Sequence, residues 1–189
     1  MKLYPTQSDF LKSEEKCKME DTITITFSGQ INVQSVKEFI ESIKNLNIKN
    51  PDSNKLVVYI SSPGGDVELA IELYNFIKSM KCKVTMINMS YVSSAAVIVF
   101  LAGDERISLP FSSFYVHSIS KKLDGNFTIT DLDREIREMK LNTNKIIKLL
   151  EVSTLKPKSY WKSLMSKGSV IAAEKAVKVG LIQYIKEYE

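Results

Sequence analysis

Apolar strands and amphipathic helices alternate three times between Thr22 and Gly103, and this alternation constrains the fold more than any other feature of the chain. The helical stretches carry apolar residues at spacings of three and four, whereas the strand stretches are short runs rich in β-branched residues. In chain order, the expected elements cover residues 22–27, 33–46, 56–60, 67–77, 83–88 and a short run from 94. Such alternation predicts an α/β fold with a parallel sheet flanked by helices.

A turn of serine, proline and glycine, Ser61–Gly65, joins the second strand to the second helix. Glycine lets the backbone approach a ligand closely. Backbone N–H groups at such a turn can also donate to a developing negative charge, as in an oxyanion hole. An ordinary strand-to-helix connection has the same composition, so this motif alone does not decide between the two interpretations.

A second motif is Ser94, which precedes the apolar run Ala95–Ala102. We expect this run to form a short buried helix with Ser94 as its N-cap, because serine is a common N-cap and the run is apolar on every side. A hydroxyl there would lie at the positive end of the helix dipole, where an oxyanion is stabilised. Capping alone would explain the serine equally well.

His117 is the only histidine of the chain and follows the strand-like run Phe114–Val116. Histidine is the side chain whose ordinary pKa suits proton transfer near neutral pH. A serine and a histidine on neighbouring elements can form a nucleophile and its general base, although a lone histidine is often only a packed residue. The chain therefore has a single candidate for the base.

Taken together, these motifs resemble the Clp-type serine peptidases (ClpP), within the wider crotonase-like superfamily, over residues 22 to 188. The resemblance rests on four segments in the same order: Ile60–Gly65, Ser93–Ala96, Arg106–His117 and Ala172–Ile182. It implies a crotonase-like spiral of ββα units with a protruding strand-helix handle at about 122–150. Residues 21–189 would then form a single domain, while residues 1–20 match no pattern.

The resemblance also implies roles for individual residues. Ser94 would be the nucleophile, with Ser93 as the less favoured alternative because it shifts the family spacing by one. His117 would be the general base, and the backbone N–H groups of Gly65 and Ala95 would form the oxyanion hole. The implied activity is that of a serine endopeptidase, which hydrolyses peptide bonds through an acyl-enzyme on Ser94.

The chain departs from the family at the position of the third catalytic residue, where an aspartate is expected and Gly168 stands. Three explanations remain open at this point. Another carboxylate could orient His117, with Asp124, Asp131 and Glu174 as candidates. A backbone carbonyl or a water near Gly168 could hold the ring and leave a slow dyad. Alternatively, the chain is a catalytically weak or inactive structural or regulatory subunit of a mixed ring.

A third class of function is acyl-thioester chemistry of the crotonase type. Those enzymes use the oxyanion turn without a serine and a histidine in these two places, which argues against this interpretation. Neither the peptidase nor the thioester interpretation requires a cofactor. The sequence also shows no spacing of residues typical of a metal site.

The resemblance further implies a homo-oligomeric ring, a heptamer or double heptamer, in which the handle interlocks two rings. The apolar stripe along residues 132–150 fits such a handle. Peptides or unfolded proteins would be the substrates, and an ATP-dependent unfoldase would be a partner. A net charge of +4, with 26 basic and 22 acidic residues interspersed, does not indicate nucleic-acid binding.

The two cysteines, Cys17 and Cys82, lie far apart and suit free thiols in a reducing compartment. Residues 1–20 lack the apolar core of a signal peptide, and no stretch is long enough to span a membrane. We therefore expect a cytoplasmic protein.

Overall fold

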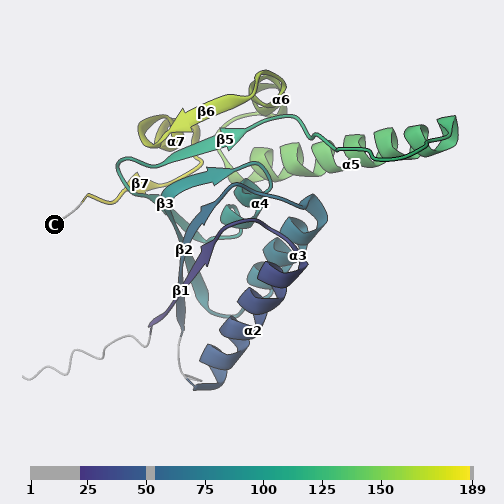
Figure 1. Cartoon of the computed structure of the whole chain (residues 1–189). Coiled ribbons are helices and arrows are strands. Elements are labelled where there is room, and N and C mark those ends of the chain that lie inside the picture. Colours follow the sequence, from purple (N-terminus) through teal and green to yellow (C-terminus); the bar gives the residue numbers. More distant parts are fainter. Residues whose placement is uncertain (1–21, 50–53, 188–189) are drawn as a thin grey trace, which may run out of the picture.

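Seven strands form one sheet in the computed structural model, which describes residues 22–49 and 54–187 (Figure 1). The elements, in chain order, are β1 (Thr22–Ser28), α2 (Val33–Lys49), β2 (Lys55–Ser62), α3 (Val67–Lys78), β3 (Lys83–Ser93), α4 (Ala96–Phe100), β4 (Glu105–Ser108), β5 (Ser113–Val116), α5 (Ile129–Ser153), α6 (Lys158–Lys167), β6 (Ser169–Ala172), α7 (Ala173–Val179) and β7 (Tyr184–Ile185). The N-terminal segment 1–20, including Cys17, lies outside the described residues.

The main path of the sheet is β1-β2-β3-β4-β7, and all of its neighbouring strands run parallel. Helices α2 and α3 connect the first three strands, as in other parallel sheets, where each crossover needs a helix or a long loop. The parallel α/β architecture predicted from the alternation is thus confirmed. Helix α2 continues to Lys49, three residues beyond the end predicted from the sequence.

On the edge away from β2, strand β3 pairs with two different strands along its length. Its first part, 85–88, pairs with β4, whereas its last part, 91–93, pairs with β5. The strand therefore runs to Ser93, beyond the Asn88 end predicted from the sequence, and carries the chain from one part of the sheet to the other. Strand β5 also pairs with β6, antiparallel. This arrangement places residue 94 directly beside β5.

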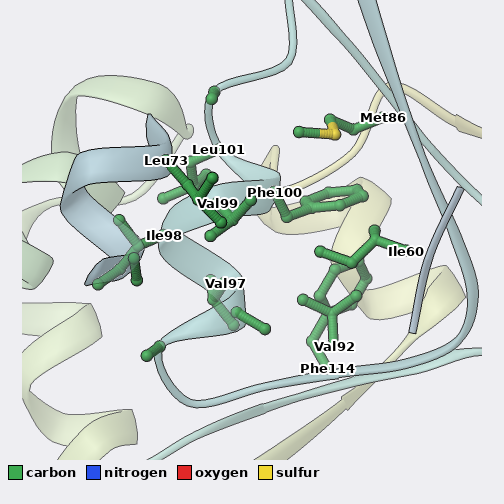
Figure 2. Packing of buried hydrophobic residues seen from close by; sticks show 14 of the residues in the cluster. Ile60, Leu73, Met86, Val92, Val97, Ile98, Val99, Phe100, Leu101 and Phe114 are labelled. Carbon is green, nitrogen blue, oxygen red and sulfur yellow. The ribbon is translucent and has the colours of Figure 1, made fainter. Parts of the chain in front are cut away.

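The short helix α4 is the centre of the core, and all five of its residues are buried (Figure 2). Phe100 packs edge-on against Phe114 of β5, with ring centroids 5.0 Å apart. Ile60 of β2 and Val92 of β3 lie in the same cluster. The prediction of a buried helix after Ser94 is confirmed, and its burial fixes the position of the residues that precede it.

Helix α5 has 25 residues and so is about 37 Å long, and only its last third is buried in the domain. Its first part projects from the fold (Figure 1), and Ile129 and Ile136 are exposed there. The strand expected at the start of the handle is not formed, because a β-ladder needs a neighbouring strand and residues 117–128 pair with none in the described chain. Within the described ranges, the helices are too short or too polar to cross a membrane.

Candidate active site

Ser94 lies between β3 and α4 with a backbone φ of 56°, the only positive φ of a non-glycine residue in the described part of the chain. The predicted N-cap role of Ser94 is wrong: Ala95 holds the N-cap position, with a helical φ of −58°. The hydroxyl of Ser94 does not cap the helix because it is hydrogen-bonded to the side chain of the residue that follows β5. A left-handed conformation costs a serine about 1–3 kcal/mol, and such strain is typical of functional sites.

The partner of Ser94 is His117, whose Nε2 lies 2.9 Å from the Ser94 Oγ. The other ring nitrogen, Nδ1, lies 2.6 Å from the backbone carbonyl oxygen of Ser118. A carbonyl oxygen can only accept a hydrogen bond, so Nδ1 carries the hydrogen in the neutral ring. Nε2 is then unprotonated and can accept the proton of the serine hydroxyl. The structure thus brings the predicted nucleophile and the predicted base together in the reactive tautomer.

None of the three candidate carboxylates contacts His117. Asp124 forms an ion pair with Lys122 at 3.2 Å. Asp131 forms the capping box of α5 with Thr128, and hydrogen bonds from the Thr128 hydroxyl and N–H lower the pKa of Asp131.

The third candidate, Glu174, lies in the first turn of α7. The first of the three explanations thus finds no support in the structure, because each of these carboxylates lies on a loop or helix end and none is a hydrogen-bond partner of His117. The acceptor is a backbone carbonyl, that of Ser118, as in the second explanation. Ser118 lies close to Gly168, because the Ser118 hydroxyl and the Gly168 N–H both donate to the Met165 carbonyl oxygen, the hydroxyl at 3.3 Å.

Gly168 ends α6 with a left-handed φ of 62° and donates its N–H to the Met165 carbonyl oxygen. Glycine is common at this position because it adopts the left-handed conformation without strain. Sequence reasoning missed Ser118 as a member of the site. No signal in the sequence could have found it, since every residue has a carbonyl.

The glycine turn packs directly against the Ser94 segment. A Cβ at Gly64 would lie 2.6 Å from the Ser93 carbonyl oxygen, which leaves no room for a side chain. Gly65 forms a parallel bridge with Ile31, in which Ile31 bonds to the flanking residues Gly64 and Asp66. The bridge leaves the N–H of Gly65 unused, and the N–H of Ala95 likewise donates to no acceptor among the described residues.

A cleft of about 470 Å³ is lined by three of the four predicted site residues, Gly65, Ser94 and His117. The fourth, Ala95, is buried beside Ser94 and is not among the lining residues. The remaining wall is largely apolar, with side chains from α3, α4, α5 and α6 and from the loop after His117: Val67, Val97, Ile119, Ile146, Leu150 and Met165. The described residues contain no group of three or more histidine, cysteine or acidic side chains that could hold a metal ion. The arrangement is suited to binding an apolar side chain next to a serine–histidine pair.

Known proteins resemble the chain in both sequence and fold. Subunit 2 of the ATP-dependent Clp protease of Borreliella burgdorferi is 32% identical over 132 residues, which cover 66% of this chain and 64% of the relative, just under two thirds of its length. Proteolytic subunit 3 of Rhizobium etli is 24% identical over 177 residues, or 93% of this chain and 89% of that protein. A ClpP1 point mutant from Listeria monocytogenes has the same fold, with a TM-score of 0.78 and 22% identity over 91% of this chain and 95% of that one.

The sequence model of the Clp protease family matches residues 12–189, which include every strand and helix of the structure. The resemblance inferred from the four motifs is thereby confirmed, and the chain belongs to the Clp protease family.

Proposed function

We propose that the chain is a serine endopeptidase of the Clp proteolytic-subunit type that works with a Ser94–His117 dyad. The observation that carries this proposal is the 2.9 Å contact between the Ser94 Oγ and the unprotonated Nε2 of His117, in a cleft large enough for a peptide side chain. A nucleophile within hydrogen-bond reach of a base, which is itself oriented by a third group, is the general requirement for acyl transfer.

In this mechanism the Ser94 Oγ attacks the carbonyl carbon of a peptide bond while His117 takes the hydroxyl proton. His117 then gives the proton to the leaving amine, and a water molecule releases the acyl-enzyme. The N–H groups of Gly65 and Ala95 would donate to the oxyanion, which is supported by their lack of any other acceptor in the described chain.

The Ser118 carbonyl orients His117 but carries no formal charge. It therefore stabilises the imidazolium that forms during the reaction less than a carboxylate would. In a different serine protease, changing the triad acid to an amide lowers kcat about 10⁴-fold. We expect slow turnover, and an inactive subunit of a mixed ring is the alternative that the test below addresses.

The substrates would be peptides or unfolded proteins with an apolar side chain next to the cleaved bond, since most of the other side chains that line the cleft are apolar. A homo-oligomeric ring, heptameric or double heptameric, is supported by the exposed apolar residues on the projecting part of α5, which would be covered between subunits. The relatives are named as subunits of ATP-dependent proteases, so an ATP-driven unfoldase is the partner that we propose.

The test is intact-mass analysis after incubation with a fluorophosphonate, in which an activated serine displaces fluoride from phosphorus. We expect one adduct on the natural chain and none on Ser94→Ala. Ser93→Ala is the matched control, because Ser93 is the neighbouring buried serine, and it should label normally. A natural chain that assembles but forms no adduct would overturn the proposal in favour of an inactive subunit.

A further inference from the structure

The aromatic ring of Tyr115 lies flat against the imidazole of His117. The ring centroids are 5.1 Å apart and the planes differ by 20°. The two residues are separated by one position at the end of β5, so their side chains lie on the same face, while Val116 between them is buried on the other. Tyr115 thus covers one face of the proposed general base.

The backbone of Tyr115 is held from both sides. It pairs with Ser93 of β3 and with Val170 of β6. Its carbonyl oxygen also accepts a hydrogen bond of 2.8 Å from the N–H of Ser94. The ring is therefore anchored to the same backbone that carries the proposed nucleophile, which makes it a fixed surface for the imidazole.

The hydroxyl of Tyr115 reaches Gly168. A Cβ at Gly168 would lie 2.9 Å from this hydroxyl oxygen, whereas the nearest ring carbons would be at ordinary contact distances of 3.7 and 3.8 Å. The tyrosine hydroxyl thus occupies the room that a side chain at position 168 would need. The absence of a side chain at 168 and the presence of the tyrosine complement each other.

We propose that Tyr115 is a positioning residue that holds the His117 ring in its reactive orientation, and that Gly168 is the small residue which makes room for it. The stacked ring restricts rotation of the imidazole, while the Ser118 carbonyl holds one edge of it. This inference rests on the proposed function, because it assigns the restriction to a catalytic base. Contact with the tyrosine ring thus provides part of the restraint on the His117 imidazole that a charged aspartate would provide.

The test uses the single histidine of the chain, because ¹⁵N-histidine labelling then gives one pair of ring-nitrogen signals that report the tautomer. We expect the Nδ1–H form in the natural chain and in Tyr115→Phe, which keeps the aromatic plane. In Tyr115→Leu we expect a mixture of tautomers and a kcat about ten- to a hundredfold lower, with KM nearly unchanged, because the base is misplaced but the cleft remains.

Tyr184→Leu is the matched control, since Tyr184 is an exposed tyrosine on β7 and should change neither the tautomer nor kcat. If Tyr115→Leu keeps both the single tautomer and the natural kcat, the positioning role is refuted. The spectrum does not depend on turnover. If the natural chain is not labelled by the fluorophosphonate, the proposed function fails, while the tautomer still decides the role of Tyr115.

A double-mutant cycle tests the link with Gly168. Gly168→Ala should disturb the His117 tautomer in the natural background, because the new Cβ meets the Tyr115 hydroxyl. In Tyr115→Phe that hydroxyl is gone, so the same alanine should be tolerated and the natural tautomer restored. The strain of a positive φ at 168 is the same in both backgrounds and cancels. Equal disturbance in both backgrounds would overturn the proposed complementarity between Tyr115 and Gly168.

Discussion

Gly64 and Ser94 are in direct contact across the candidate site: a Cβ on Gly64 would lie 2.8 Å from the Cβ of Ser94. The two residues are separated by helix α3 and strand β3 in the sequence, yet each restricts the position of the other. The glycine turn thus supports the Ser94 backbone and also contains Gly65, whose N–H is a proposed oxyanion donor.

Gly64→Ala should therefore reduce turnover sharply, because the new methyl group must displace the Ser93–Ser94 backbone by a few tenths of an ångström or more. Gly29→Ala is an unusually close control: Gly29 has a φ of +90° against +89° for Gly64, but has no atom within 4 Å of the Cβ position. Both variants carry about the same backbone strain, on the order of 1 kcal/mol.

Fluorophosphonate labelling rates and urea unfolding of both variants make the comparison. We expect Gly29→Ala to lose stability but to keep its labelling rate, and Gly64→Ala to lose at least about tenfold in rate. Equal labelling rates in the two variants would show that the contact between Gly64 and Ser94 does not affect the reactivity of Ser94.

Ser94→Gly should be at least as stable as Ser94→Ala. Glycine adopts a φ of 56° freely, whereas alanine keeps the strain of the natural serine. In an ordinary extended position the order is reversed, because glycine costs about 0.5–1 kcal/mol more conformational entropy on folding.

The free energy of unfolding can be followed by the fluorescence of Trp161, the only tryptophan and fully buried. Ser93→Gly and Ser93→Ala form the control pair, since Ser93 is an ordinary strand residue, and there alanine should be the more stable. If alanine is the more stable at both positions, the strain assigned to Ser94 is absent.

The sequence predicted well what depends on local pattern. The alternation between Thr22 and Gly103 predicted the parallel sheet, and the run after Ser94 predicted a buried helix. Contacts between distant segments were not predictable. The Ser94 hydroxyl was expected to cap α4, but its hydrogen bond goes to a residue 23 positions later.

The third member of the site was missed for a related reason. A search for carboxylates could not find the Ser118 carbonyl, because a backbone group has no signature in the sequence. The stacking of Tyr115 on His117 could have been suspected from their spacing of two at a strand end, although its relation to Gly168 depends on how β5 and β6 pair.

Asp104 should contribute stability that is lost in acid. Its carboxylate accepts hydrogen bonds from Lys78 Nζ at 2.9 Å and from the N–H of Val84 at 3.0 Å. Burial alone raises the pKa of Asp104, but these hydrogen bonds outweigh it and the pKa lies below its ordinary value. A lowered pKa stabilises the folded state above the ordinary pKa, and this contribution disappears as the pH falls through the lowered pKa.

Urea unfolding of the natural chain and of Asp104→Asn across the pH range measures this contribution. The difference in the free energy of unfolding should be constant near neutral pH and should shrink below about pH 4. The ion pair with Lys78 is about half exposed, so the whole effect should be under about 1 kcal/mol. A difference that stays constant into acid would contradict the assignment.

Arg106 joins the C-terminal segment to the core, and its removal should be far more costly. Its guanidinium is buried and donates to four backbone carbonyl oxygens, those of Leu181 at 2.9 Å, Ser153 at 2.7 Å, and Gly103 and Gly180 at 3.3 Å. No carboxylate pairs with it among the described residues, and burial lowers the pKa of Arg106.

Arg106→Met keeps much of the buried volume but leaves these carbonyl groups without their donor. Because each unsatisfied buried polar group costs about 1–3 kcal/mol, we expect a loss of about 3 kcal/mol or more in the free energy of unfolding. Arg106→Lys should lose less, since an ammonium can still donate to some of the four oxygens. Arg137→Met, at an exposed arginine on the projecting part of α5, is the control and should change stability by no more than about 0.5 kcal/mol. If the two methionine variants unfold at the same urea concentration, the side-chain contacts of Arg106 do not stabilise the fold, and the C-terminal segment is held by its backbone hydrogen bonds and its buried side chains instead.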